Sequence, residues 1–121
     1  MSRLVRALSL AVLANIAVAG HAWAHAHLKA AAPAEQAAVA SPAGLDLTFS
    51  ESVNQSFSGI RLTGPDQQEV KLEAASLADG GKTLKAPLAA KLAPGVYTVD
   101  WHVLSVDGHK TSGTYRFTVK P

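Results

Sequence analysis

Short runs of alternating hydrophobic and polar residues follow one another from residue 45 to the end of the chain. In a strand, this period-two pattern places hydrophobic side chains on one face and polar side chains on the other. The runs cover residues 45–49, 60–62, 70–72, 84–88, 97–103 and 115–119. Turn-forming sequences separate several of them, at residues 64–66, 79–82, 94–95 and 107–108. The pattern predicts an all-β domain of about seven strands, an antiparallel sandwich or barrel.

The segment from residue 29 to 44 is rich in alanine and carries a weaker signal. Pro33 and Pro42 interrupt it, so it is compatible with a short strand or a turn rather than with a long helix. No amphipathic helix, internal repeat or linker stands out elsewhere in the chain. We therefore expect a single domain.

The first 24 residues have the pattern of a secretory signal peptide. Arg3 and Arg6 give a positive start, and residues 7–20 are apolar apart from one serine and one asparagine. This core of about 14 residues is shorter than the roughly 20 that a membrane-spanning helix needs. Ala22-Trp23-Ala24 supplies the small residues of a cleavage site. We expect cleavage after Ala24 and a mature domain of residues 25–121; cleavage after Ala26 and an uncleaved anchor are the alternatives.

The composition excludes several functions. The chain carries 11 basic and 9 acidic residues, but two arginines lie in the predicted signal peptide, so the mature domain is close to neutral. Its basic residues are scattered and its aromatic residues are few, which argues against a nucleic-acid surface. The chain has no cysteine, and its single methionine is Met1. Disulfides and thiolate metal sites are therefore excluded, and the mature domain offers a metal no sulfur ligand.

Two features in the remaining sequence suit a metal ion. Cleavage after Ala24 makes His25 the first residue, and a terminal histidine can chelate a metal through its α-amine and ring Nδ1. The unperturbed pKa values of these groups, about 7.7–8.0 and about 6.5, allow both to lose their protons near neutral pH. Asp107 and His109 are two residues apart with Gly108 between them, so both side chains can point to one side. Such nitrogen and oxygen donors suit Cu(II), whereas Cu(I) prefers sulfur.

Three stretches resemble the CopC family of periplasmic copper-binding proteins, and together they span essentially the whole mature chain. They are HAHLKAAAPA from residue 25, LTFSESV from residue 47 and GVYTVDWHVLSVDGHKTSGTYRFTV from residue 95. The resemblance implies an immunoglobulin-like or cupredoxin-like Greek-key β-sandwich in the periplasm. It implies one Cu(II) ion per chain, bound at one end of the sandwich by His25, Asp107 and His109.

The resemblance also implies a role in copper homeostasis, resistance or delivery, beside a CopD-like inner-membrane copper transport protein. Some members of the family carry a methionine-rich loop that binds Cu(I), and this chain lacks it. We therefore expect a protein that binds Cu(II) alone. We also expect it to be a monomer.

Other polar residues near these motifs have two interpretations each. His27 either binds Cu(II) with the α-amine and two deprotonated backbone amides, or is an exposed side chain. Glu51 either hydrogen-bonds a ligand histidine or is a solvated glutamate at a strand end. The period-two pattern assigns Trp101 to the core, where it can also wall the copper site, and turns His102 to solvent. Ser105 and Thr111 flank the Asp107–His109 pair and could hold its loop.

Three functions are compatible with the sequence. A copper-binding protein that is not an enzyme accounts for the N-terminal histidine and for the Asp107–His109 pair. A copper-dependent oxidative enzyme with an N-terminal histidine brace would also use these donors, but it needs an open copper position and a broad substrate surface. A metal-free immunoglobulin-like interaction module would need neither histidine.

Overall fold

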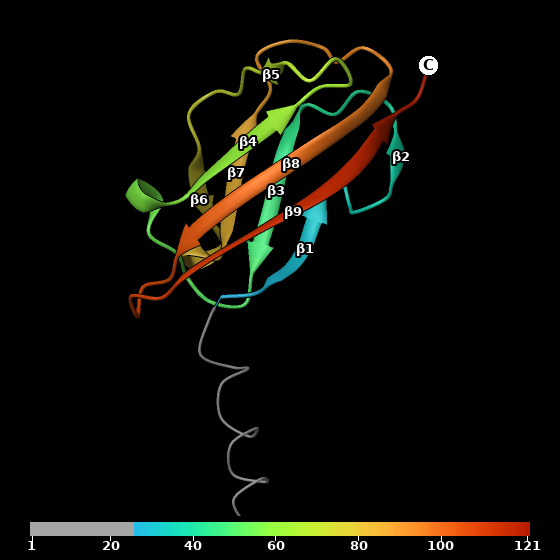
Figure 1. The fold of residues 1–121 in the computed structure, drawn as a ribbon. Helices are drawn as coiled ribbons and strands as arrows, with labels where there is room; N and C mark the ends of the chain where they lie inside the picture. The colour runs from blue at the N-terminus through green and yellow to red at the C-terminus, as the bar shows by residue number, and fades with distance from the viewer. Residues whose placement is uncertain (1–25) are drawn as a thin grey trace, which may run out of the picture.

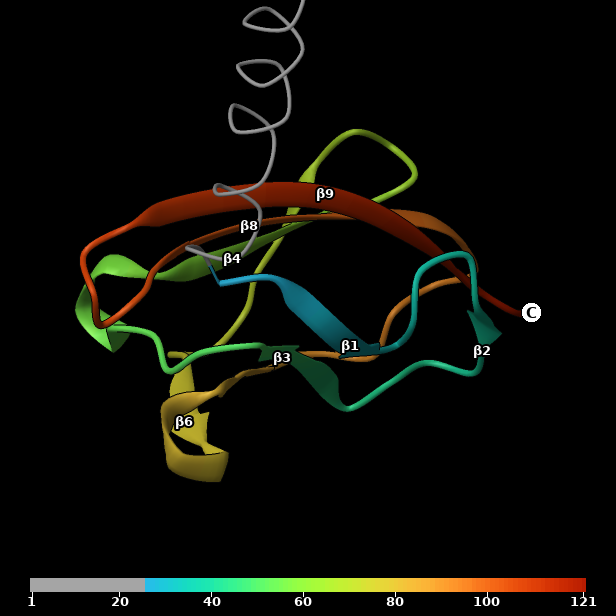
Figure 2. The same ribbon diagram turned by 90° about the horizontal axis from the view of Figure 1, so that it is seen from below.

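The computed structural model describes residues 26–121. The predicted signal peptide, its cleavage site and His25 lie outside the described residues. Within this range, the chain folds into two β-sheets that face each other (Figures 1 and 2). The β-sandwich expected from the alternating pattern is confirmed.

The described residues form nine strands and two short 3-10 helices. The strands are β1 (Leu28–Ala32), β2 (Ala38–Val39), β3 (Gly44–Phe49), β4 (Gly59–Thr63), β5 (Glu69–Val70), β6 (Ser76–Ala78), β7 (Thr83–Pro87), β8 (Gly95–Leu104) and β9 (Lys110–Val119). The helices are η1 (Gln55–Phe57) and η2 (Asp79–Gly81). β2 and β5 have only two residues each. The remaining seven strands are longer, which agrees with the expected number of about seven. No helix in residues 26–121 is long and apolar enough to cross a membrane.

One sheet has the strand order β1-β3-β7-β6, and the other has the order β2-β9-β8-β4-β5. All neighbours are antiparallel except β2 and β9, which are parallel. Seen from below, β4, β8 and β9 form one layer and β1, β3 and β6 belong to the other (Figure 2). The chain passes between the layers several times, so residues distant in sequence meet at each end of the sandwich.

The core lies between the two layers and is built from the alternating positions. In β3, Leu45, Leu47 and Phe49 are fully buried, while the residues between them are only half-buried. The ring of Phe49 meets that of Trp101 edge to face, with 5.1 Å between their centroids. A Cβ on Gly113 would lie only 2.6 Å from the Trp101 ring, so glycine at this position makes room for the indole. Trp101 is therefore a core residue, as the pattern predicts.

The alanine-rich segment forms two strands because it pairs with strands whose hydrophobic pattern is strong. β1 runs antiparallel to β3, with Leu28 opposite Phe49 and Ala32 opposite Asp46. β2 pairs with the last residues of β9. The run at residues 70–72 is less regular than the pattern suggests, because β5 ends at Val70 and Leu72 makes only an isolated bridge.

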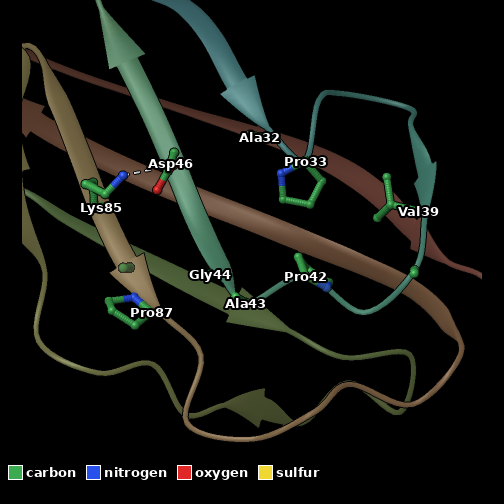
Figure 3. Close-up of a pocket in the computed structure, with 11 residues that line it drawn as sticks. Ala32, Pro33, Val39, Pro42, Ala43, Gly44, Asp46, Lys85 and Pro87 are labelled. Atoms are coloured by element: carbon green, nitrogen blue, oxygen red, sulfur yellow. Dashed lines mark hydrogen bonds and ion pairs between the residues drawn. The ribbon is translucent and has the colours of Figure 1, made fainter.

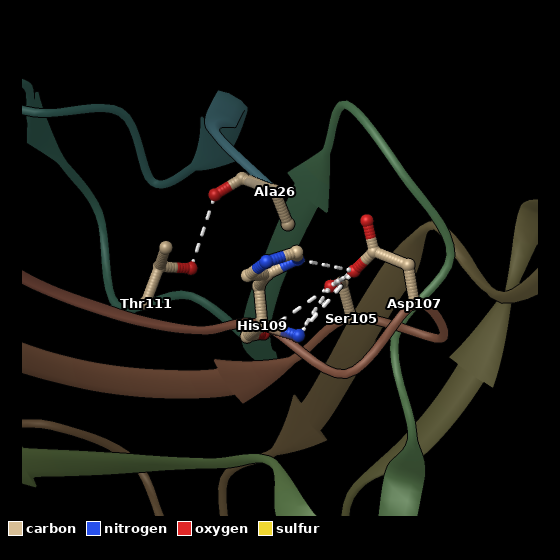
Figure 4. A network of polar contacts seen from close by, with 5 residues as sticks. All are labelled: Ala26, Ser105, Asp107, His109 and Thr111. Carbon is tan, nitrogen blue, oxygen red and sulfur yellow. Dashed lines mark hydrogen bonds and ion pairs between the residues drawn. The ribbon is translucent and has the colours of Figure 1, made fainter. Parts of the chain in front are cut away.

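The β8–β9 hairpin is the longest feature of the fold. Ten pairs of residues match across it, from Gly95 with Val119 to Leu104 with Lys110. The loop at its tip, residues 105–109, lies beside residues 52–54 through a bridge between Val53 and Ser105. Residues 26–27, which precede β1, lie at this end as well (Figures 1 and 4). We call these three segments the hairpin end.

Candidate metal centre

Asp107 and His109 face each other in the loop between β8 and β9 (Figure 4). Asp107 Oδ1 lies 3.1 Å from His109 Nδ1, and the backbone N–H of His109 donates to the same carboxylate oxygen at 3.3 Å. Their side chains are 42 % and 48 % exposed, respectively. Gly108 between them has a φ of +94°, a left-handed conformation that glycine adopts without strain. The structure thus brings together, at the protein surface, the two residues whose spacing predicted a metal-binding pair.

Ser105 fixes the shape of this loop from beneath. It is 1 % exposed, and its hydroxyl donates to Asp107 Oδ1. Ser105 Oγ also accepts the N–H of His109 at 3.3 Å, and the Ser105 N–H donates to the His109 carbonyl at 2.9 Å. The N–H of Gly108 donates to the Ser105 carbonyl at 2.9 Å. One buried serine therefore positions the backbone and the carboxylate of the pair.

These contacts also set the charge of the carboxyl group. The hydrogen bond from Ser105, followed by that from His109, holds the pKa of Asp107 below its usual value of 3.8. Hydrogen bonds to the charged form of a carboxyl group favour ionisation. Asp107 is therefore a carboxylate at neutral pH and can bind a cation without releasing a proton.

The chain enters this region through a segment held by three hydrogen bonds. Ala26 is 1 % exposed, and its carbonyl accepts the Thr111 hydroxyl at 3.0 Å (Figure 4). The N–H of His27 donates to Ser50 Oγ at 2.8 Å, and the His27 carbonyl accepts the N–H of Ser50 at 2.8 Å. The backbone on both sides of the Ala26–His27 peptide is thus fastened beside the Asp107–His109 loop, while the His27 side chain is exposed.

Two further polar residues considered in the sequence, His102 and Glu51, lie in different surroundings. His102 is exposed, with its ring against Gly59 on the outer face of the five-stranded sheet, as the strand pattern predicts. Glu51 is half-buried in the bend after β3, and its contact with a ligand histidine stays a prediction. Within residues 26–121, no group of three or more histidine, aspartate or glutamate side chains is placed to hold a metal ion.

Sequence reasoning did not decide the roles of Ser105 and Thr111, and it passed over Ser50. A serine two residues before an aspartate is a common turn pattern, so the contact from Ser105 to Asp107 had a local signal. The partners of Thr111 and Ser50 are 85 and 23 residues away in sequence, respectively, and only the fold brings them together.

A groove of about 610 Å³ lies at the opposite end of the four-stranded sheet, and we call this region the groove end (Figure 3). It is lined by Ala32, Pro33, Val39, Ala40, Pro42, Ala43, Gly44, Asp46, Lys85, Ala86 and Pro87. Its two charged residues pair with each other, with 3.1 Å between Lys85 Nζ and Asp46 Oδ2. The groove therefore offers a metal ion no cluster of donors.

A family model of the CopC domain matches residues 28–120. The chain belongs to the CopC family. The match includes every strand of the sandwich and the Asp107–His109 loop, so the CopC resemblance found in the sequence is confirmed over the described domain.

Several CopC relatives align over most of the chain. Protein YobA of Escherichia coli K12 is 50 % identical over 114 residues, covering 93 % of this chain and 92 % of its own. Copper resistance protein C of Escherichia coli is 38 % identical over 110 residues, covering 85 % and 87 %. Copper transport protein CutJ of Bacillus subtilis is 27 % identical over 99 residues, which cover 80 % of this chain but only 18 % of CutJ.

Solved CopC structures share the fold. CopC from Methylosinus trichosporium OB3b superposes with a TM-score of 0.74 at 36 % identity, covering 80 % of this chain and 95 % of that one. PcoC of Escherichia coli, described as a methionine-rich copper resistance protein, superposes with a TM-score of 0.73 at 35 % identity, covering 80 % and 100 %. This chain differs from that description, because its single methionine is Met1.

Proposed function

We propose that this chain is a periplasmic copper-binding protein that holds one Cu(II) ion and serves copper resistance or delivery. The proposed ligands are the α-amine and imidazole of His25, the carboxylate of Asp107 and the imidazole of His109. The mature protein begins at His25, after the signal peptide has been removed at Ala24. The protein binds and passes on copper rather than catalysing a reaction.

The observation that carries this proposal is the pairing of Asp107 with His109 beside a fastened Ala26. The two side chains already converge, and Ser105 holds the carboxylate in its charged form. Ala26 is fixed to β9 only two residues beyond His109. Because adjacent Cα atoms are about 3.8 Å apart, residue 25 begins within one peptide unit of that anchor. This supports a site that the N-terminal residue completes.

The chemistry of the donors favours Cu(II) over other metal ions. An amine, imidazoles and a carboxylate suit the tetragonal geometry of Cu(II), which also stands highest among the divalent ions in general affinity. Nickel and zinc would bind more weakly to the same donors. Cu(I) would find neither thiolate nor thioether in the mature chain.

The alternative Cu(II) site at His27 has a structural cost. There the metal would be bound by the His27 ring, the α-amine and the deprotonated backbone nitrogens of Ala26 and His27. The His27 nitrogen donates its proton to Ser50 Oγ at 2.8 Å, so this site would break that hydrogen bond and loosen the start of β1. The arrangement with His25, Asp107 and His109 leaves the bond intact.

The relatives support a role in copper handling. Two of the proteins aligned above are named for copper resistance and copper transport. The latter, CutJ, is much longer than its segment similar to this chain, which supports a physical association between such a domain and a transport protein. We propose that this chain acts as a monomer and exchanges copper with a CopD-like protein of the inner membrane.

The test is Cu(II) electron paramagnetic resonance on protein that begins at His25, beside a form with one extra residue before it. The proposal expects one tetragonal, nitrogen-rich signal from the native form and its loss or change in the extended form. Identical spectra would refute the His25 ligand. An unchanged copper stoichiometry after replacement of Asp107 and His109 would refute these two ligands. Absence of stoichiometric copper binding by the native form would instead favour a metal-free interaction module. Rapid reduction by ascorbate with release of peroxide would favour the oxidative enzyme.

A further inference from the structure

Thr111 stands where β9 leaves the core and reaches the hairpin end. It lies on the inward side of the strand, in phase with the buried residues Tyr115 and Phe117, and opposite Val103 of β8. Its side chain therefore points from the five-stranded sheet toward the four-stranded one. There its hydroxyl donates to the carbonyl of Ala26, the residue just before His27 and β1 (Figure 4).

This contact joins the two sheets at the point where the mature chain would begin. Ala26 is buried among the core residues, so its carbonyl has little access to water and needs a protein donor. The Thr111 hydroxyl is the donor that the described residues supply. The methyl group of Ala26 and its carbonyl are thus held independently, one by packing and the other by the hydrogen bond.

Thr111 is also two residues from His109, a proposed ligand. The end of the loop and the start of β9 therefore carry one proposed ligand and the group that holds the neighbour of another. A chain end that is already ordered loses less conformational entropy when it closes on a metal ion, so fixing Ala26 should favour closure by His25.

We propose that the Thr111 hydroxyl is a positioning group for the copper site. It holds Ala26 so that the N-terminal residue, His25, binds Cu(II) readily and dissociates from it slowly. Thr111 does not touch the metal. It acts through Ala26 on the residue before it. This inference rests on the proposed function, because it assigns His25 as a ligand.

The experiment measures how fast Cu(II) passes from the loaded protein to excess EDTA, followed by the visible absorbance of the copper site. Thr111→Val replaces the hydroxyl by a methyl group of similar size and should speed release about two- to tenfold, the range that loss of one neutral hydrogen bond produces. Thr111→Ser keeps the hydroxyl and should release copper at the wild-type rate.

Thr114→Val is the matched control. Thr114 also lies on β9, but on the outer face of the sheet. Its hydroxyl also donates a hydrogen bond, in this case to the side-chain oxygen Asp100 Oδ1. The proposal expects wild-type release from this variant. Thermal unfolding of each metal-free variant shows whether Thr111→Val has kept its fold at the temperature of the measurement.

A second background separates positioning from a general effect on the loop. The same substitution is made in the form with one residue added before His25, where the terminal amine cannot close on copper. A positioning role predicts that Thr111→Val no longer changes the release rate there, because the two changes act through one group. An equal acceleration in both backgrounds would overturn the inference and assign the effect to the Asp107–His109 loop.

The failure of the inference and that of the proposed function give different results. If adding a residue before His25 weakens copper binding, but Thr111→Val does not alter copper release from the native form, then His25 is a ligand and Thr111 does not position it. If extension changes neither the spectrum nor the release rate, the proposed donor set is wrong, and the role of Thr111 falls with it.

Discussion

The two ends of the sandwich are held together by different contacts. At the hairpin end, the hydroxyls of Ser105 and Thr111 donate hydrogen bonds and that of Ser50 accepts one. Together these bonds fasten two chain segments around an exposed carboxylate and imidazole. At the groove end, alanine and proline residues surround a hollow of about 610 Å³ in which the two charged groups pair with each other. The groove end has an open volume but few potential metal donors, whereas the hairpin end has potential donors that converge without a deep cavity.

The difference shows what a metal site needs from a protein. A bare ion is small, so affinity depends on how many donors converge and how firmly their orientation is held, rather than on empty volume. Lys85 offers only N–H donors and neutralises Asp46, so the groove end lacks a second metal ligand beside that carboxylate. At the hairpin end, the groups around Asp107 orient it and leave its outer side open to solvent.

The largest expected effect comes from removing a proposed ligand at the hairpin end. Asp107→Asn keeps the shape of the side chain but removes its charge, and His109→Ala removes the imidazole. Loss of a group behind a metal ligand typically costs about 10–100-fold in affinity, so loss of a ligand itself should weaken Cu(II) binding by at least about a hundredfold. Competition titration against a chelator of known affinity measures the change.

Asp46→Asn at the groove end is the matched control for Asp107→Asn. It removes a carboxylate of similar exposure that also accepts from a basic group, and it should leave Cu(II) affinity unchanged. If both substitutions weakened binding equally, the site would not be confined to the hairpin end, and the comparison between the two ends would fail.

A smaller effect is expected from Ser105→Ala, which keeps both proposed ligands but removes the hydroxyl beneath them. The carboxylate of Asp107 loses its main hydrogen bond, so Cu(II) affinity should fall about 10–100-fold. Urea unfolding of the metal-free protein should show a lower free energy of unfolding, because Asp107 Oδ1 and the His109 N–H lose a hydrogen-bond partner. Ser112→Ala, an exposed serine on β9, should change neither quantity; equal effects from the two serines would contradict the role of Ser105.

The pH dependence of Asp107 should follow the same hydrogen bond. Its pKa is lowered in the folded protein, so its contribution to stability is complete above the unfolded value near 3.8 and is lost as the pH falls through the lower folded value. A carboxyl-carbon NMR titration of the metal-free protein should therefore give a midpoint below 3.8. In Ser105→Ala the midpoint should move up toward 3.8, and an unmoved midpoint would show that Ser105 is not the main cause.

The smallest effect is expected from breaking the ion pair at the groove end. Both side chains are nearly half exposed, at 47 % for Lys85 and 45 % for Asp46, and exposed pairs contribute about 0–1 kcal/mol. Lys85→Ala should lower the free energy of unfolding by less than about 1 kcal/mol and leave copper affinity unchanged. A greater loss in urea unfolding, or a weaker copper affinity, would mean that the two ends are coupled through β3 and β7.

The sequence was a good guide where the side chains themselves carried the structural signal. β3, β8 and β9 each bury one face, so their alternation predicts both the strand and the buried residues. β1 and β2 are poor in such a pattern and form because their backbones pair with β3 and β9, respectively. Edge strands of this kind depend on their partners more than on their own residues.

The candidate site divides in the same way. The Asp107–His109 pair could be predicted because two residues on either side of a glycine are close in any turn of this kind. The holding role of Ser105 and Thr111 could not be decided, because burial and a partner 85 residues away are set by the whole fold. The assignment of His25 falls outside the described residues and stays a prediction.

The sequence separation of these contacts has a consequence for folding. Asp107 and His109 are two residues apart and can meet as soon as the hairpin turn forms, whereas the contact between Thr111 and Ala26 closes a loop of 85 residues. Local contacts form early, and long loops are closed at a greater entropic cost. With the proposed ligands, a partly folded chain would offer copper only the weak pair, and full affinity would arise when the two sheets have joined. Tight copper binding would then mark the molecules that have finished folding.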